Sequence, residues 1–128
     1  MKLLDYAGFA IVLAISTPAY AGTTTVDLFR SGNTTSARME NVRVNDVTQV
    51  TEGGVVYVLP NSGGISTFSS SAGVSTTVWK IPKGTVYPDT IKVWNDTPGH
   101  WAWEPASKMT LANFTSIMAS MNAKCVKN

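Results

Sequence analysis

The chain has 128 residues, 10 Lys and Arg against 8 Asp and Glu, and a formal net charge of +2. The basic residues are scattered, so this charge gives no footprint of a nucleic-acid-binding or membrane-binding protein. The single cysteine, Cys125, excludes an internal disulfide, and we expect a free thiol, although pairing with another molecule is the alternative. One Cys and one His cannot supply the four ligands of a structural zinc site, so no metal is predicted.

Residues 1–21 have the pattern of a secretory signal peptide. A weakly basic start precedes an apolar run over residues 7–15, and Ala19-Tyr20-Ala21 forms a small-x-small cleavage site. The run is too short to span a bilayer, and the alternative is an N-terminal strand or buried helix. We therefore predict cleavage after Ala21, a secreted protein without stable membrane association, and one domain over residues 22–128.

The rest of the sequence is typical of short strands followed by one helix. Alternating or β-branched runs separated by Gly, Pro and Asn predict strands over residues 25–30, 55–59, 65–69, 76–81, 91–94 and 100–104. Residues 37–44 are ambiguous between a short helix and a strand, and residues 95–99 predict a turn. Thr110 is a natural N-cap for a C-terminal helix with an apolar stripe. The class is α+β, with mixed or antiparallel strands partly covered by that helix.

Two charged residues are candidates for a site. Arg30 ends the first predicted strand, where a guanidinium can bind phosphate oxygens, although many such arginines are simply solvated. Glu104 lies in an aromatic run before Pro105 and would be poorly solvated, which suits acid–base or cation-stabilising chemistry. The alternative for Glu104 is an exposed edge carboxylate. His100 falls on the same predicted strand face and could assist by hydrogen bonding, or could be structural.

The segment Gly63-Gly64-Ile65-Ser66-Thr67-Phe68 is the most informative part of the sequence. Paired glycines usually serve a turn, but the missing Cβ of Gly64 would also let a flat ligand ring lie against the backbone. Ser66 and Thr67 would then offer hydroxyl groups to a ribose. Phe68 could pack beneath the ring or fill the core.

The order of these elements resembles the ADP-ribosyltransferase-like toxins, in particular the small type VI secretion effector toxins of this fold and their secreted relatives. The resemblance extends from about Val26 to Met121. It is carried by Leu-Phe-Arg at 28–30, Gly-Gly-Ile-Ser-Thr-Phe at 63–68, Ile-Pro-Lys-Gly-Thr at 81–85, and His-Trp-x-x-x-Pro-Ala with Met-Thr-Leu-x-x-Phe at 100–114. It implies an ADP-ribosyltransferase-like fold that holds NAD, as a substrate, in a cleft between two small sheets.

The resemblance also implies roles for the candidate residues. Arg30 matches the first-strand arginine that positions the dinucleotide, and Ser66 with Thr67 matches the element that supports the nicotinamide ribose. Glu104 matches the catalytic glutamate, which bonds the ribose and steadies an oxocarbenium-like centre as nicotinamide leaves. On this hypothesis Arg30, Ser66 and Glu104 converge on one cleft. The partners would be an unknown protein or other acceptor, and an immunity protein.

One position departs from the family pattern. Many such transferases carry Gln or Glu two residues before the catalytic glutamate, where this chain has Ala102. NAD hydrolysis or an unusual acceptor is therefore an alternative to ordinary mono-ADP-ribosyl transfer. Two further hypotheses stay open: a secreted binding or effector module that keeps the fold without the chemistry, and an RNA phosphotransferase-like domain, which the lack of basic clustering disfavours.

Overall fold

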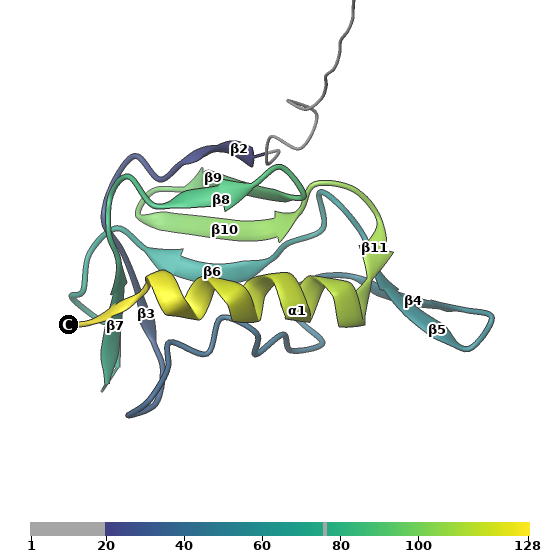
Figure 1. Cartoon of the computed structure of the whole chain (residues 1–128), viewed down its shortest axis with the longest axis horizontal. Helices are drawn as coiled ribbons and strands as arrows, with labels where there is room; N and C mark the ends of the chain where they lie inside the picture. The colour runs from purple at the N-terminus through teal and green to yellow at the C-terminus, as the bar shows by residue number, and fades with distance from the viewer. Residues whose placement is uncertain (1–19, 76) are drawn as a thin grey trace, which may run out of the picture.

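The computed structural model describes residues 20–75 and 77–128. Its elements in chain order are β2 (Tyr20–Thr23), β3 (Leu28–Ser31), β4 (Gln49–Glu52), β5 (Val55–Val58), β6 (Ile65–Phe68), β7 (Val78–Ile81), β8 (Val86–Pro88), β9 (Ile91–Thr97), β10 (His100–Pro105), β11 (Met109–Thr110), α1 (Leu111–Met121), the 3₁₀ helix η2 (Asn122–Lys124) and β12 (Val126–Lys127) (Figure 1).

The predicted signal peptide lies mainly outside the described residues. Strand β2 crosses the predicted cleavage site after Ala21, and its Gly22 and Thr23 pair with β8. In the described part of the chain, no helix is long and apolar enough to cross a membrane.

The main sheet has six strands in the order β12-β7-β3-β6-β10-β9, and every pairing in it is antiparallel. Strands β12, β7 and β3 form one part of it, and β6, β10 and β9 form the other (Figure 1). The two parts meet through a single residue pair, Phe29 opposite Phe68. This junction sets Arg30, the next residue of β3, beside the strand that carries Ser66.

A smaller sheet of β11, β5 and β4 contains a hairpin that projects from the body of the molecule (Figure 1). Gly53 and Gly54 form its turn with φ values of +58° and +79°. A two-residue hairpin turn of this kind needs positive φ at both positions, which glycine adopts without strain. The predicted strand at 55–59 is thus confirmed as β5, but Val55 is exposed where the apolar run suggested a buried strand.

Helix α1 packs over one face of the main sheet. Its N-cap is Thr110, whose hydroxyl accepts a hydrogen bond from the Asn113 backbone N–H, as the sequence predicted. Phe114, Met118 and Met121 are buried in the core, together with β-strand residues that include Leu28, Ile65, Ile81 and Trp103. On β6, Ile65 and Thr67 are fully buried and Ser66 and Phe68 are not. Because strand side chains alternate, Ser66 and Phe68 point to the face opposite the core. The α+β class, with mostly antiparallel strands, is therefore confirmed.

The long connection between β3 and β4 has no regular secondary structure, although residues 37–44 could have been a helix or a strand. Its side chains bond the local backbone instead. Asn33 accepts from the Ser36 N–H, and Asp46 accepts from the Arg43 N–H. Arg38 has a φ of +54°, which interrupts any helix or strand. This connection forms a wall beside β3 and β6.

Candidate active site

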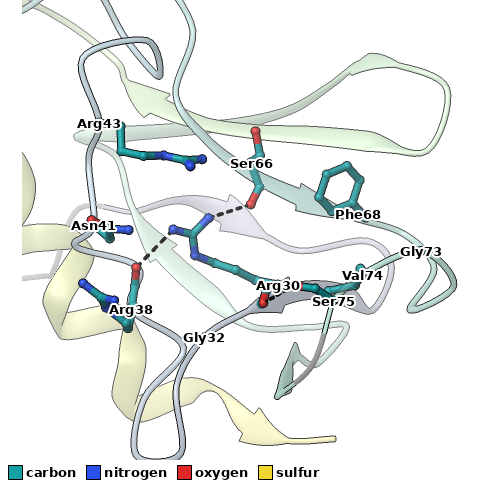
Figure 2. Close-up of a pocket in the computed structure, with 11 residues that line it drawn as sticks. Arg30, Gly32, Arg38, Asn41, Arg43, Ser66, Phe68, Gly73, Val74 and Ser75 are labelled. Atoms are coloured by element: carbon teal, nitrogen blue, oxygen red, sulfur yellow. Dashed lines mark hydrogen bonds between the residues drawn. The ribbon is translucent and has the colours of Figure 1, made fainter.

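A cavity of about 560 Å³ opens between β3, β6 and the β3–β4 connection (Figure 2). Strand side chains, the loop wall and the segment before β7 all contribute to it. The lining residues are Arg30, Ser31, Gly32, Arg38, Asn41, Arg43, Ser66, Phe68, Gly73, Val74 and Ser75. Two of the three residues expected to converge, Arg30 and Ser66, therefore share one cavity. Their sequence positions are 36 residues apart.

Arg30 is held by three backbone carbonyls. Its Nε donates to Ala37 at 3.1 Å, one terminal nitrogen to Ser66 at 3.0 Å, and the other to Arg38 at 3.1 Å (Figure 2). Burial lowers the pKa of the Arg30 guanidinium below its usual value, and the negative charge of Asp46 opposes that shift. Arg30 thus ties the loop wall to β6 and leaves part of its five-donor guanidinium facing the cavity.

Ser66 contributes two groups in different directions. Its carbonyl accepts from Arg30, and its hydroxyl lies on the other side of the residue (Figure 2). The Oγ atom is 2.9 Å from Nε2 of His100, and Nδ1 of the same imidazole is 2.5 Å from Oδ1 of Asp96. His100 therefore lies within hydrogen-bonding distance of Ser66. Asp96 was not foreseen, because a turn was predicted over residues 95–99 and β9 in fact continues to Thr97.

Phe68 and Thr67 have different roles despite being neighbours. Phe68 lines the cavity with 40% of its surface exposed, and its ring meets the His100 ring edge-on at 5.4 Å. Thr67 is fully buried; its hydroxyl donates to the Trp101 carbonyl and accepts from the Trp103 indole. The expectation that Thr67 offers its hydroxyl to a ribose is not met by this geometry, because the side chain is fully buried and its hydroxyl proton is already donated to Trp101.

Gly64 has a packing role. A Cβ atom there would lie 2.1 Å from the carbonyl oxygen of Trp103, so the absent side chain allows β10 to approach. Gly64 does not line the cavity among the residues given above. The space expected to receive a flat ligand ring is filled by the protein's own backbone.

Glu104 lies elsewhere. Its side chain is only 1% exposed and its carboxylate accepts hydrogen bonds from the Asn61 backbone N–H at 3.0 Å and the Trp94 indole at 2.5 Å. The ammonium group of Lys92 is 3.9 Å away. In the register of β10 against β6, Ala102 stands opposite Ser66, with His100 to one side and Glu104 to the other. Glu104 is not among the residues that line the cavity of Arg30 and Ser66, so the expectation that the three share one cleft is not met.

Two further arginines were missed by sequence reasoning. Arg38 and Arg43 lie in the loop wall, and Figure 2 shows the Arg43 side chain extending toward Ser66. Arg43 is 72% exposed and pairs weakly with Asp46 at 3.6 Å. The sequence does contain three arginines within residues 30–43, but only the fold shows that all three line one cavity.

The cavity suits a substrate with negative charge and sugar hydroxyls. Arginines surround a serine hydroxyl and an exposed aromatic ring, and no Asp or Glu is found among its described lining residues. Across residues 20–75 and 77–128, His, Cys, Asp and Glu do not gather in any group of three that could hold a metal ion.

Comparison with known proteins gives one match. The model of a family described as the Tse2 ADP-ribosyltransferase toxin matches residues 26–128. Searches of curated proteins and of solved structures found no match. The matched region contains β3, β6 and β10, and with them Arg30, Ser66 and His100. With this coverage and the observed α+β fold, the chain belongs to the Tse2 ADP-ribosyltransferase toxin family.

Proposed function

We propose that this protein is a secreted toxin that cleaves NAD at the bond between nicotinamide and ribose and transfers the ADP-ribosyl group to an acceptor or to water. Its family supports ADP-ribosyl transfer in general. The observation that carries the proposal for this chain is the meeting of Arg30 and Ser66 in one arginine-lined cavity.

In this proposal, different cavity residues bind different parts of NAD. Arg38 and Arg43 supply positive charge for the pyrophosphate, because guanidinium groups bind phosphate oxygens bidentately. Phe68 offers an exposed ring on which a flat base or nicotinamide can stack. Ser66 offers its hydroxyl to the ribose, and Arg30 holds the Ser66 backbone in place.

Glu104 does not serve as the catalytic carboxylate in this proposal. It is buried and its oxygens already accept two hydrogen bonds, so a ribose could reach it only by displacing protein groups. The position two residues earlier, Ala102, is buried and has no polar side chain. Recognition of the acceptor must therefore come from other groups, and hydrolysis by water is included in the proposal.

Nicotinamide release tests the chemistry. The purified wild-type protein should release nicotinamide from NAD, and Ser66→Ala should slow release by about tenfold or more. Ser120→Ala is the matched control, because Ser120 is exposed on α1 and its hydroxyl bonds only within that helix. No release by the wild-type protein, together with no heat of NAD binding in calorimetry, would defeat the proposal.

The second candidate function is a secreted binding module without chemistry. The absence of Asp and Glu from the described lining of the cavity favours it. In the cleavage of glycosidic bonds, a carboxylate usually stabilises the positive charge that develops at the anomeric carbon. Calorimetry separates the two candidates. Binding of NAD without any release of nicotinamide would identify the module, and release would identify the enzyme.

Secretion and toxicity need their own measurements. Mass spectrometry of the exported protein should find an N-terminus at Gly22, which would support cleavage after Ala21. Expression of residues 22–128 in the cytosol should arrest growth, and the Ser66→Ala variant should not. Growth arrest that Ser66→Ala leaves intact would separate toxicity from this cavity. An immunity protein, which we include as a partner, should restore growth when expressed with the toxin.

A further inference from the structure

Three side chains form a continuous hydrogen-bonded chain behind the cavity. Oδ1 of Asp96 is 2.5 Å from Nδ1 of His100, and Nε2 of His100 is 2.9 Å from Oγ of Ser66. His100 and Asp96 have side-chain exposures of 26% and 27%. They are therefore partly shielded from water, while Ser66 connects them to the cavity.

The β9–β10 hairpin builds this arrangement. Pro98 and Gly99 form its turn, and Gly99 has a φ of +77°, which fits the third position of a type II turn. The Asn95 side chain donates to the carbonyls of Thr97 and His100 and so closes the hairpin end. The register shifts between His100 and Trp101, which marks an irregularity at this end of the hairpin. Such bulges redirect side chains, and they often occur beside active sites.

The chemistry of the carboxylate fixes the direction of the hydrogen bonds. An ionised carboxylate only accepts, so Nδ1 of His100 must carry the proton that it shares with Asp96. In neutral imidazole Nε2 is then an acceptor, and the Ser66 hydroxyl donates to it. The oxygen lone pairs of Ser66 are left available to a hydroxyl proton presented from the cavity.

We propose that Asp96 and His100 are positioning residues that make Ser66 a proton acceptor during ADP-ribosyl transfer. This inference rests on the proposed function. The bond from ribose to the nicotinamide nitrogen breaks, and nicotinamide leaves with that electron pair. A bond forms from the anomeric carbon to the oxygen of water or of an acceptor hydroxyl. That oxygen gives its proton to Ser66, Ser66 gives its own proton to Nε2 of His100, and the imidazolium later returns it to water.

The charges around Asp96, His100 and Ser66 agree with this role. Burial tends to raise the pKa of the Asp96 carboxyl, but its interactions with His100 and its hydrogen bonds to the backbone at Asp96 and Thr97 together hold that pKa below its usual range. Asp96 is thus ionised at neutral pH and can stabilise the imidazolium. The other charged groups near Ser66 are Arg30, at its carbonyl, and Arg43, across the cavity (Figure 2). Asp96 therefore places one negative charge behind His100, outside a cavity whose lining includes three arginines.

Steady-state kinetics test the inference. His100→Gln and Asp96→Asn should each lower kcat by about 100-fold, with the dissociation constant for NAD unchanged within about twofold. Asp96→Glu should recover part of the rate, because it restores the carboxylate. Asp89→Asn is the control for losing an exposed carboxylate elsewhere.

NMR spectroscopy tests the same hydrogen bonds of Asp96, His100 and Ser66 without a measurement of activity. The protein has one histidine, so its ¹⁵N imidazole signals need no assignment, provided that purification avoids a polyhistidine tag. The wild-type signals should report the Nδ1–H form, and Asp96→Asn should shift the proton toward Nε2.

The outcomes are distinguishable. Normal release with unchanged kcat in His100→Gln would overturn the relay alone, and so would an Nε2–H form in the wild-type protein. A wild-type protein that releases no nicotinamide would overturn the proposed function and the relay with it.

Discussion

The Arg30 guanidinium and the Ser66 carbonyl are joined by a 3.0 Å hydrogen bond beside the only residue pair that connects β3 to β6 in the described sheet. The same guanidinium bonds the carbonyls of Ala37 and Arg38 in the loop wall. Arg30 therefore holds together the two sides of the cavity, whatever contact it makes with a substrate. Its loss should affect folding as well as function.

We predict that Arg30→Lys lowers the free energy of unfolding by about 3 kcal/mol, because one ammonium group cannot reach three carbonyls and leaves the partly buried acceptors of Ala37 or Ser66 unpaired. Urea unfolding measures the change. Arg43→Lys is the matched control, since Arg43 is mostly exposed and should change stability by less than about 0.5 kcal/mol. Equal losses in the two variants would show that the three carbonyl contacts do not stabilise the fold.

Glu104→Gln should destabilise the protein without removing its activity. The carboxylate accepts from two N–H donors and lies near Lys92, whereas a glutamine amide would turn one N–H₂ group toward a donor. The expected loss is about 2 kcal/mol in the free energy of unfolding.

The control for Glu104→Gln is Glu52→Gln, whose carboxylate is 56% exposed and pairs with Lys108 on the surface. That variant should be near neutral. Nicotinamide release should be measured well below the melting temperature of each variant. A stable Glu104→Gln protein that has lost release would restore Glu104 to the catalytic role that the family resemblance implied.

Gly64→Ala should be among the most damaging single changes. Its Cβ would lie 2.1 Å from the Trp103 carbonyl oxygen and 2.9 Å from the Glu104 Cα, so two strands would have to separate. The expected cost is about 3 kcal/mol in unfolding free energy, or failure to fold. Gly22→Ala is the control, because the nearest atom to its new Cβ is the Tyr87 hydroxyl oxygen at an ordinary 3.5 Å. Thermal melting that is equal for both variants would contradict this account of the glycine.

The sequence was sufficient for most of the elements. Alternation and turn residues predicted β5, β6 and β10, and the N-cap Thr110 placed the start of α1 correctly. Strand β9 was predicted too short, because Asn95, Asp96 and Thr97 have turn-forming side chains. Pairing with β10 overrides that local preference, which is why the strand end could not be found from composition.

The site was harder to predict than the fold. Arg30 was singled out by its place at a strand end, and Ser66 and Phe68 by the segment that follows the paired glycines; the family resemblance then implied roles for Arg30 and Ser66. Glu104 was chosen as the carboxylate from its aromatic surroundings, but its burial and its hydrogen bonds to Asn61 and Trp94 are tertiary properties. The contact of Asp96 with His100 depends on a turn and a register shift, so no spacing rule would have indicated it.

Cys125 gives a prediction about pH. Burial raises the pKa of its thiol from 9.0 to about 11, although Arg30 pulls it slightly the other way, and Sγ donates to the Met121 carbonyl at 3.4 Å. At pH 8 the thiol should therefore react slowly with a disulfide reagent in the folded protein and quickly in urea. Fast labelling of the folded protein would contradict the burial of this group.

The same shift makes stability depend on pH in a known direction. Between pH 9 and 11 the unfolded thiol ionises while the folded thiol keeps its proton, so unfolding releases a proton and rising pH favours the unfolded chain. The contribution of the Cys125 thiol to the free energy of unfolding is fully present below pH 9 and is lost as pH rises through about 11. Urea unfolding of the wild-type protein and Cys125→Ala across this range isolates it, because all other titrating groups are common to both. The wild-type curve should fall more steeply with pH, and parallel curves would show that the folded thiol ionises as readily as the unfolded one.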